Sequence, residues 1–222
     1  MKFEDKLVVV SGTAGILGEA VARAFHECGA TVIGIDVVEH RAPFRSFELD
    51  LLDLTETKKV IDSLGSIDIL ANIAGGFTMG ETVAETTDET WDYMMNLNVR
   101  TMLNLVRAVV PVMRESNNGG RIVNVGAHGA LHGSALMGSY VAAKSVVIRT
   151  TESLAAELKQ DRINVNCVLP SIIDTPRNRQ DMPNADHSKW VSPEALARVV
   201  LFLSSADAEP IHGAALPVTG LV

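Results

Sequence analysis

The chain has 222 residues and a mass of 23.8 kDa, which suits one domain with a full hydrophobic core and leaves little room for two. With 47% hydrophobic and 21% charged residues, the composition excludes a disordered or collagen-like protein. The formal net charge of −8 repels polyphosphates, so we expect neither a nucleic acid nor an anionic membrane as partner.

The first residues are charged and lead into four apolar residues, Leu7 to Val10, before a Ser-Gly pair. This run is too short for a signal peptide or a membrane span, so we expect a cytoplasmic protein. The two cysteines, Cys28 and Cys167, lie in separate apolar segments without metal-ligand spacing. We therefore expect reduced, buried thiols and no disulfide.

Seven short apolar runs rich in β-branched residues are predicted strands: 7–10, 31–35, 47–49, 67–71, 122–125, 165–169 and 216–218. Between them lie helical patterns at 16–28, 55–64, 88–115, 139–159 and 193–204. The pattern at 88–115 is expected to break near Asn98. Capping signals mark two helix starts, Asp53 with Glu56, and Ser192 before Pro193.

Strands that are apolar throughout are typical of a parallel sheet buried on both faces. Their alternation with helices predicts an α/β fold, a single-domain, Rossmann-like doubly wound parallel sheet with helices on both faces. The polar stretch 176–189 is predicted to be an inserted loop that shapes a site.

The first predicted strand is followed by Gly12-Thr13-Ala14-Gly15-Ile16-Leu17-Gly18 and then by a helix. Glycines in this position let backbone N–H groups approach a pyrophosphate, and a helix N-terminus favours the negative charge. The alternative is a tight turn without a ligand. Asp36, at the end of the next strand and eighteen residues after Gly18, favours a dinucleotide site because its carboxylate can bind ribose hydroxyls.

The charge of Asp36 would repel a 2′-phosphate, and neither Thr13 nor Val37 offsets that charge. The predicted cofactor is therefore NAD(H) and not NADP(H). Arg41 is the nearby basic residue that could weaken this preference.

Tyr140 and Lys144 lie four residues apart on the helix predicted at 139–159. At this spacing both side chains leave the same face, so the ammonium is expected to lower the pKa of the tyrosine from about 10. A phenol of this kind is a usable acid or base.

Together these motifs resemble the short-chain dehydrogenase/reductase family over essentially the whole chain. The glycine turn, Asp50, Asn72-Ile73-Ala74-Gly75, Asn98 after Trp91-Asp92, the Tyr140/Lys144 pair and Pro170 to Thr175 match family motifs in order. The resemblance implies hydride transfer between a nicotinamide and a small-molecule substrate. It makes Tyr140 the acid or base, Lys144 its electrostatic partner at the nicotinamide ribose, and Asn98 part of a water-linked proton relay.

The resemblance also implies the residues that bind the cofactor. They are Gly12, Gly15, Ile16, Leu17, Gly18, Asp36, Val37, Asp50, Leu51, Asn72, Ala74, Gly75, Tyr140, Lys144, Pro170, Ile173 and Thr175. Thr175 would bind the carboxamide. Two plainer alternatives stay open: Asn98 only bonds a backbone carbonyl at a kink, or Thr175 only caps a turn.

The sequence departs from the family at Ala127, where a catalytic serine is usual. Loss of such a hydroxyl typically costs about 3 to 4 kcal/mol of transition-state stabilisation. Either His128 or Ser134 substitutes for it, or the substrate is electrophilic enough to need no donor, or the chain binds NAD without turnover. His128 and His132 have HxxxH spacing, but without the glutamate of zinc proteases we expect no metal site.

Several segments are similar to one branch of the family, the quinoid dihydropteridine reductases, which also lack the serine. These segments are 12–18, 34–39, 74–77 and 174–186. A quinonoid pterin is primed to accept hydride, and Phe77, where the branch has tryptophan, could stack on such a ring. Phe77, Ala127 and His128 are therefore the predicted substrate residues. Asn98 belongs to the pattern of the wider family.

The sequence thus predicts an NAD(H)-dependent oxidoreductase that reduces a quinonoid dihydropterin or similar electrophilic ring. The alternatives are a general carbonyl reductase or alcohol dehydrogenase, and an NAD-binding regulator without turnover. The resemblance also implies a homodimer or homotetramer built on helices 101–115 and 139–159. Small residues such as Ala142 and Val146 would allow helices to approach closely there, or could face the protein's own sheet.

Overall fold

The computed structural model describes all 222 residues, Met1 to Val222. Seven parallel strands form one sheet in the order β3-β2-β1-β4-β5-β6-β7. They are β1 (Leu7–Ser11), β2 (Thr31–Asp36), β3 (Arg45–Glu48), β4 (Ile69–Asn72), β5 (Gly120–Val125), β6 (Ile163–Pro170) and β7 (Ala215–Val218). From β1 the strands are added first toward one edge of the sheet (β2, β3) and then toward the other (β4 to β7). This switch between β1 and β4 leaves a crevice at their carboxyl ends.

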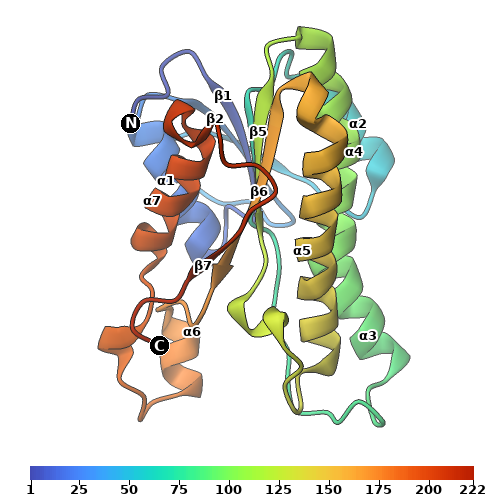
Figure 1. Cartoon of the computed structure of the whole chain (residues 1–222), viewed down its shortest axis with the longest axis vertical. Coiled ribbons are helices and arrows are strands. Elements are labelled where there is room, and N and C mark those ends of the chain that lie inside the picture. The colour runs from blue at the N-terminus through green and yellow to red at the C-terminus, as the bar shows by residue number, and fades with distance from the viewer.

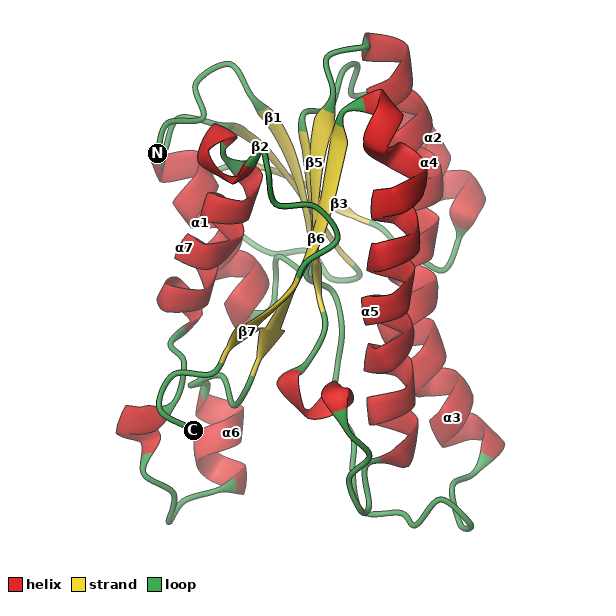
Figure 2. Cartoon of the chain, viewed as in Figure 1, coloured by secondary structure: helices red, strands yellow, loops and turns green.

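Helices cover both faces of the sheet (Figures 1 and 2). On one face lie α1 (Ile16–Glu27) and α7 (Pro193–Ser204), and on the other α2 (Leu54–Asp62), α4 (Thr101–Ser116) and α5 (Gly138–Leu158). Helix α3 (Asp88–Met95) runs into α4 through a π-helical turn, η1 (Asn96–Arg100). None of the helices combines the length and the apolar character that a bilayer span requires.

Alternation along the central strands builds a core on each side of the sheet. Val8 and Val10 of β1 pack with Phe25 of α1, whereas Val9 belongs to the core beneath α4 with Leu105. Successive residues of a strand point to opposite faces of the sheet. Because helices cover both faces, the residues on each face need apolar side chains, and the strands are apolar throughout. The edge strands β3 and β7 are only partly buried, because no further strand pairs with their outer edges.

The doubly wound α/β fold and all seven predicted strands are confirmed. The break predicted near Asn98 is also confirmed, and it takes the form of η1. Both predicted helix N-caps are confirmed. The Asp53 side chain accepts hydrogen bonds from the N–H groups of Thr55 and Glu56 at the start of α2, and the Ser192 side chain accepts one from the N–H of Ala195 at the start of α7.

Two expectations were wrong. The segment 176–189 is not a plain loop, since it forms the short helix α6 (Pro176–Asp181), capped by Thr175, and a 3-10 turn, η4 (His187–Lys189). Cys167 is fully buried, but Cys28 is only partly buried because it follows the last turn of α1 near the surface. Both thiols are free.

Candidate active site

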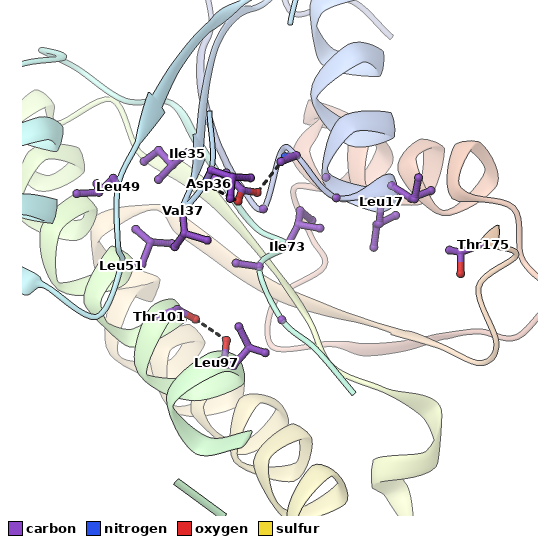
Figure 3. Close-up of a pocket in the computed structure, with 18 of the residues that line it drawn as sticks. Leu17, Ile35, Asp36, Val37, Leu49, Leu51, Ile73, Leu97, Thr101 and Thr175 are labelled. Atoms are coloured by element: carbon purple, nitrogen blue, oxygen red, sulfur yellow. Dashed lines mark hydrogen bonds between the residues drawn. The ribbon is translucent and has the colours of Figure 1, made fainter. Parts of the chain in front are cut away.

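A cavity of about 700 Å³ opens at the carboxyl ends of β1, β2, β3 and β4 (Figure 3). Its position at the crevice between β1 and β4 is where open α/β sheets bind ligands. It is lined by Gly12, Ala14, Gly15, Ile16, Leu17, Gly18, Ile35, Asp36, Val37, Val38, Leu49, Leu51, Ile73, Ala74, Gly75, Leu97, Thr101, Thr175, Pro176 and Arg177.

The glycine turn after β1 is the floor of this cavity, and its glycines are required sterically. Gly12 has a φ of +74°, a conformation that side chains with a Cβ rarely adopt. A Cβ on Gly18 would lie 1.9 Å from the carbonyl oxygen of Gly12, so helix α1 can start this close to β1 only with glycine. The result is bare backbone facing the cavity.

Asp36 connects the end of β2 to the glycine turn. Its Oδ2 accepts a hydrogen bond from the N–H of Ala14 at 2.9 Å, and its Oδ1 accepts one from the N–H of Val38 at 3.4 Å (Figure 3). The carboxylate is therefore held at the cavity wall, beside Val37 and Leu51, where it can accept further hydrogen bonds from a diol.

The residues present fit a dinucleotide. No side chain caps the N-terminus of α1, whereas side chains cap α2, α3, α6 and α7. The first N–H groups of α1 are thus free to bind an anion that crosses the glycine turn. NAD would be held by this turn and by Asp36.

Lys144, one helical turn after Tyr140 on α5, lies next to Asn98 and Gly75. A Cβ added to Gly75 would lie 2.8 Å from Asn98 Oδ1 and 3.1 Å from Lys144 Nζ, so all three meet at one point. Because Gly75 also lines the cavity, the polar cluster adjoins the predicted cofactor site. Segments that lie far apart in the sequence thus come together here.

The predicted effect of Lys144 on the pKa of Tyr140 was wrong. Lys144 Nζ donates a hydrogen bond to the carbonyl oxygen of Val125 at 2.9 Å, at the end of β5. Burial raises the pKa of Tyr140 to about 12 and lowers the pKa of Lys144 to about 8. In this environment, desolvation outweighs the expected attraction, and the phenol holds its proton at neutral pH.

Asn98 and Thr175 both make the structural hydrogen bonds that the plainer alternatives expected. Asn98 Nδ2 donates to the carbonyl oxygen of Met94 at 3.1 Å, while its Oδ1 accepts from the N–H of Gly76. Thr175 Oγ1 accepts from the N–H of Asn178 and caps α6, yet Thr175 also lines the cavity. Each therefore has a structural bond and a place at the site.

Two of the three predicted substrate residues, Phe77 and Ala127, lie near Tyr140. The rings of Phe77 and Tyr140 stack edge to face with centroids 4.8 Å apart, and Phe77 is half exposed. Ala127 is buried and lies in the apolar cluster against which Tyr140 packs. His128 is exposed in the 3-10 turn η2 (His128–Leu131). Nowhere do three or more potential metal ligands converge.

Six predicted cofactor residues do not line the cavity. Asp50 Oδ1 accepts from the N–H of Leu52, and Asn72 is buried and donates to Asn124 Oδ1. The others are Tyr140, Lys144, Pro170 and Ile173.

Conversely, the cavity is lined by residues that sequence reasoning missed. They are Ala14, Ile35, Val38, Leu49, Ile73, Leu97, Thr101, Pro176 and Arg177. Most of these residues are apolar, so their side chains do not mark them in the sequence as binding residues. The ones that follow strand ends could have been predicted to line the cavity, because ligands bind at the carboxyl ends of parallel strands.

Comparison with known proteins agrees with this architecture. Residues 6–186 match the family model described as short chain dehydrogenase. A 3-oxoacyl-(acyl-carrier-protein) reductase from Vibrio harveyi is 32% identical, with 99% of this chain and 98% of the relative covered. Dehydrogenase/reductase SDR family member 6 from Rattus norvegicus is 30% identical, with the same shares covered.

Among solved structures, a carveol dehydrogenase from Mycobacterium avium in complex with NAD superimposes with a TM-score of 0.89. It is 26% identical, and the match covers 99% of this chain and 98% of that one. The predicted enzyme class, an NAD-dependent oxidoreductase, is confirmed. The chain therefore belongs to the short-chain dehydrogenase family.

Proposed function

We propose that the protein is an NADH-dependent reductase in which Tyr140 donates the proton. The observation that carries the proposal is the meeting of Lys144 and Asn98 at Gly75, beside the cavity floored by the glycine turn, with Tyr140 one helical turn before Lys144 on α5. Bound NADH supplies a hydride. Because burial keeps the pKa of Tyr140 at about 12, its hydroxyl is protonated at neutral pH and suits the reductive direction.

The preference for NADH rests on the wall around Asp36. The carboxylate lies beside Val37 and Val38, and no basic side chain lines that end of the cavity (Figure 3). A 2′-phosphate there would face an uncompensated negative charge. Arg41, the basic residue that could have weakened the preference, does not line the cavity.

For the substrate we propose a quinonoid dihydropterin or a similarly electrophilic planar ring. Two observations support this choice. Ala127 brings no hydroxyl to the polar cluster, so the substrate must accept hydride without that donor. Half-exposed Phe77, against the ring of Tyr140, offers an aromatic surface on which a planar ring can stack.

The second candidate is a general carbonyl or alcohol substrate. It is favoured by Asn98, which follows the pattern of the wider family and lies beside Lys144. The curated relatives include reductases of ketoacyl groups and dehydrogenases, which also point to carbonyl chemistry.

The test is oxidation of NADH and of NADPH with a quinonoid dihydropterin, a simple ketone and an aldehyde. We expect activity with NADH and the quinonoid ring, and we expect Tyr140→Phe to lower kcat/KM by about 100-fold or more. Tyr93→Phe, which changes the exposed tyrosine of α3, is the matched control and should leave kcat/KM unchanged.

The other outcomes separate the alternatives. Tyr140-dependent turnover of the ketone alone would establish the carbonyl reductase. Cofactor binding without Tyr140-dependent turnover of any substrate would establish an NAD-binding regulator. A clear preference for NADPH would contradict the role given to Asp36.

We also propose that the chain forms a homodimer or homotetramer through α4 and α5, which cover the same face of the sheet (Figure 1). Of the small residues on α5, Ala143, Val147 and Ala155 are buried within the chain. Val146 is exposed and lines a shallow groove with Ser145, Arg149, Thr150 and Ser153. This outer face is the one left for a second copy.

A further inference from the structure

The cavity carries one acidic and one basic side chain, at different ends. The acidic one is Asp36, at the end of β2, and the basic one is Arg177, in α6. Figure 3 shows Asp36 and Thr175 on opposite sides of Leu17, which belongs to the first turn of α1. Arg177 follows Thr175 by two residues, so this basic residue belongs to the segment at the Thr175 end of the cavity.

Arg177 is held by a single ion pair at the surface. Its Nε donates to Asp181 Oδ2 at 2.7 Å, one turn along α6, and 81% of the Arg177 side chain is exposed. Water screens a surface pair of this kind, so exchanging Asp181 for another anion costs little. Arg179, the other arginine of α6, is held by both oxygens of Asp174 and does not line the cavity.

The glycine turn and the start of α1 offer only backbone N–H groups and a partial positive charge to a pyrophosphate. A dinucleotide brings two negative charges there, and the chain as a whole has a net charge of −8. A guanidinium can bind phosphate oxygens through two parallel N–H groups.

We infer that Arg177 is a binding residue for the cofactor pyrophosphate, which it reaches from the α6 side by leaving Asp181. The inference rests on the proposed dinucleotide site. It assigns to the segment 176–181 the task of closing over the phosphates with a full positive charge that the glycine turn lacks.

The experiment measures Kd for NADH by fluorescence, and for ADP-ribose and adenosine by competition. ADP-ribose carries the pyrophosphate without the nicotinamide, and adenosine carries neither. We expect Arg177→Gln to raise Kd for NADH and ADP-ribose by about 10- to 100-fold and to leave adenosine unchanged. Arg179→Gln removes the same charge from the same helix and should change each Kd less than about twofold.

A second variant works in the opposite direction. Asp181→Asn releases Arg177 from its ion pair and should lower Kd for NADH and ADP-ribose. Equal losses in the two arginine variants, a loss that extends to adenosine, or no loss in Arg177→Gln would overturn the inference. Wild-type protein that binds no NADH at all would instead overturn the proposed function, so the two failures are distinguishable.

Discussion

Lys144 is a cation in a buried place, with 5% of its surface exposed and the carbonyl oxygen of Val125 as its acceptor. Desolvation lowers its pKa from 10.5 to about 8, so the folded chain holds this charge at a cost in stability. Strongly shifted pKa values of this kind cluster at functional sites, where a bound ligand can interact with the charged group. The burial of the Lys144 ammonium therefore supports a role for this residue in the site.

The cost of burying the Lys144 ammonium predicts that the free energy of unfolding depends on pH. Between pH 8 and pH 10, Lys144 is protonated in the unfolded chain and largely neutral in the folded one. At this site the unfolded state therefore binds more protons, and Lys144 should contribute a rise of about 2 kcal/mol to the free energy of unfolding across this window, against the opposite contribution of Cys167, whose pKa burial raises to about 11. Urea denaturation of wild type and Lys144→Met at a series of pH values measures the rise, which the variant should lack.

Lys159→Met, which changes an exposed lysine just after α5, is the matched control and should keep the wild-type slope. An identical pH slope in wild type and Lys144→Met would show that Lys144 does not titrate as its burial requires.

Ala127 occupies the position at which the resemblance to the family leads us to expect a catalytic serine. Because Ala127 packs in the same cluster as Tyr140, a serine there would place a hydroxyl near the reacting atoms. We expect Ala127→Ser to raise kcat for simple ketones by about tenfold or more, since a donor to a developing oxyanion supplies about 3 to 4 kcal/mol when well placed. Steady-state kinetics of NADH oxidation measures the effect.

For a quinonoid ring, Ala127→Ser should change kcat less than about threefold, because that substrate needs no such donor. Ala127→Gly serves as the control for altered packing without a hydroxyl. Equal effects of serine on ketone and quinonoid turnover would contradict the reason given for the missing serine.

At the scale of elements, a buried chain of polar side chains fixes α5 to the sheet. Asn72 of β4 donates to Asn124 of β5, and Asn124 Nδ2 donates to Thr151 Oγ1 at 2.9 Å. Thr151 lies two helical turns after Lys144 and is 1% exposed. The chain of hydrogen bonds therefore holds the face of α5 that carries Tyr140 and Lys144 against the strands.

Removal of the Thr151 hydroxyl should weaken this attachment. Thr151→Val keeps the shape of the side chain but leaves the amide of Asn124 without its acceptor, so we expect a loss of about 1 to 3 kcal/mol in the free energy of unfolding. Thr151→Ser keeps the hydroxyl and should lose less. Urea denaturation decides, and a serine variant as unstable as the valine variant would show that methyl packing is what matters at this position.

At the scale of the whole molecule, the outer face of α5 is the surface we assign to self-association. Light scattering at micromolar concentration should give at least twice the chain mass of 23.8 kDa. Val146→Glu should yield the monomer, because it places a charge at the centre of that face, where a facing copy would have to desolvate it. Val38→Glu, at the cavity mouth, is the control and should not change the mass. A wild-type monomer would contradict the assignment.

Much of the fold and the outline of the site could be predicted from sequence. The seven strands and the glycine turn are local patterns, because a strand buried on both faces must be apolar throughout and only glycine tolerates the approach of Gly18 to Gly12. The helical spacing of Tyr140 and Lys144 likewise puts both on one face of α5.

The direction of the pKa shifts and the place of Arg177 depended on tertiary structure alone. Burial of Tyr140 and Lys144 is set by β5, η1 and the segment after β4, which pack against α5 from far away in the sequence, and desolvation there outweighs the attraction that spacing suggests. Arg177 belongs to no sequence motif that indicates cofactor binding. Only the folding of 176–181 into a helix at the cavity mouth brings its charge to the site. Local sequence thus determined which backbone forms, while long-range packing decided the charge and solvation of the side chains that the chemistry uses.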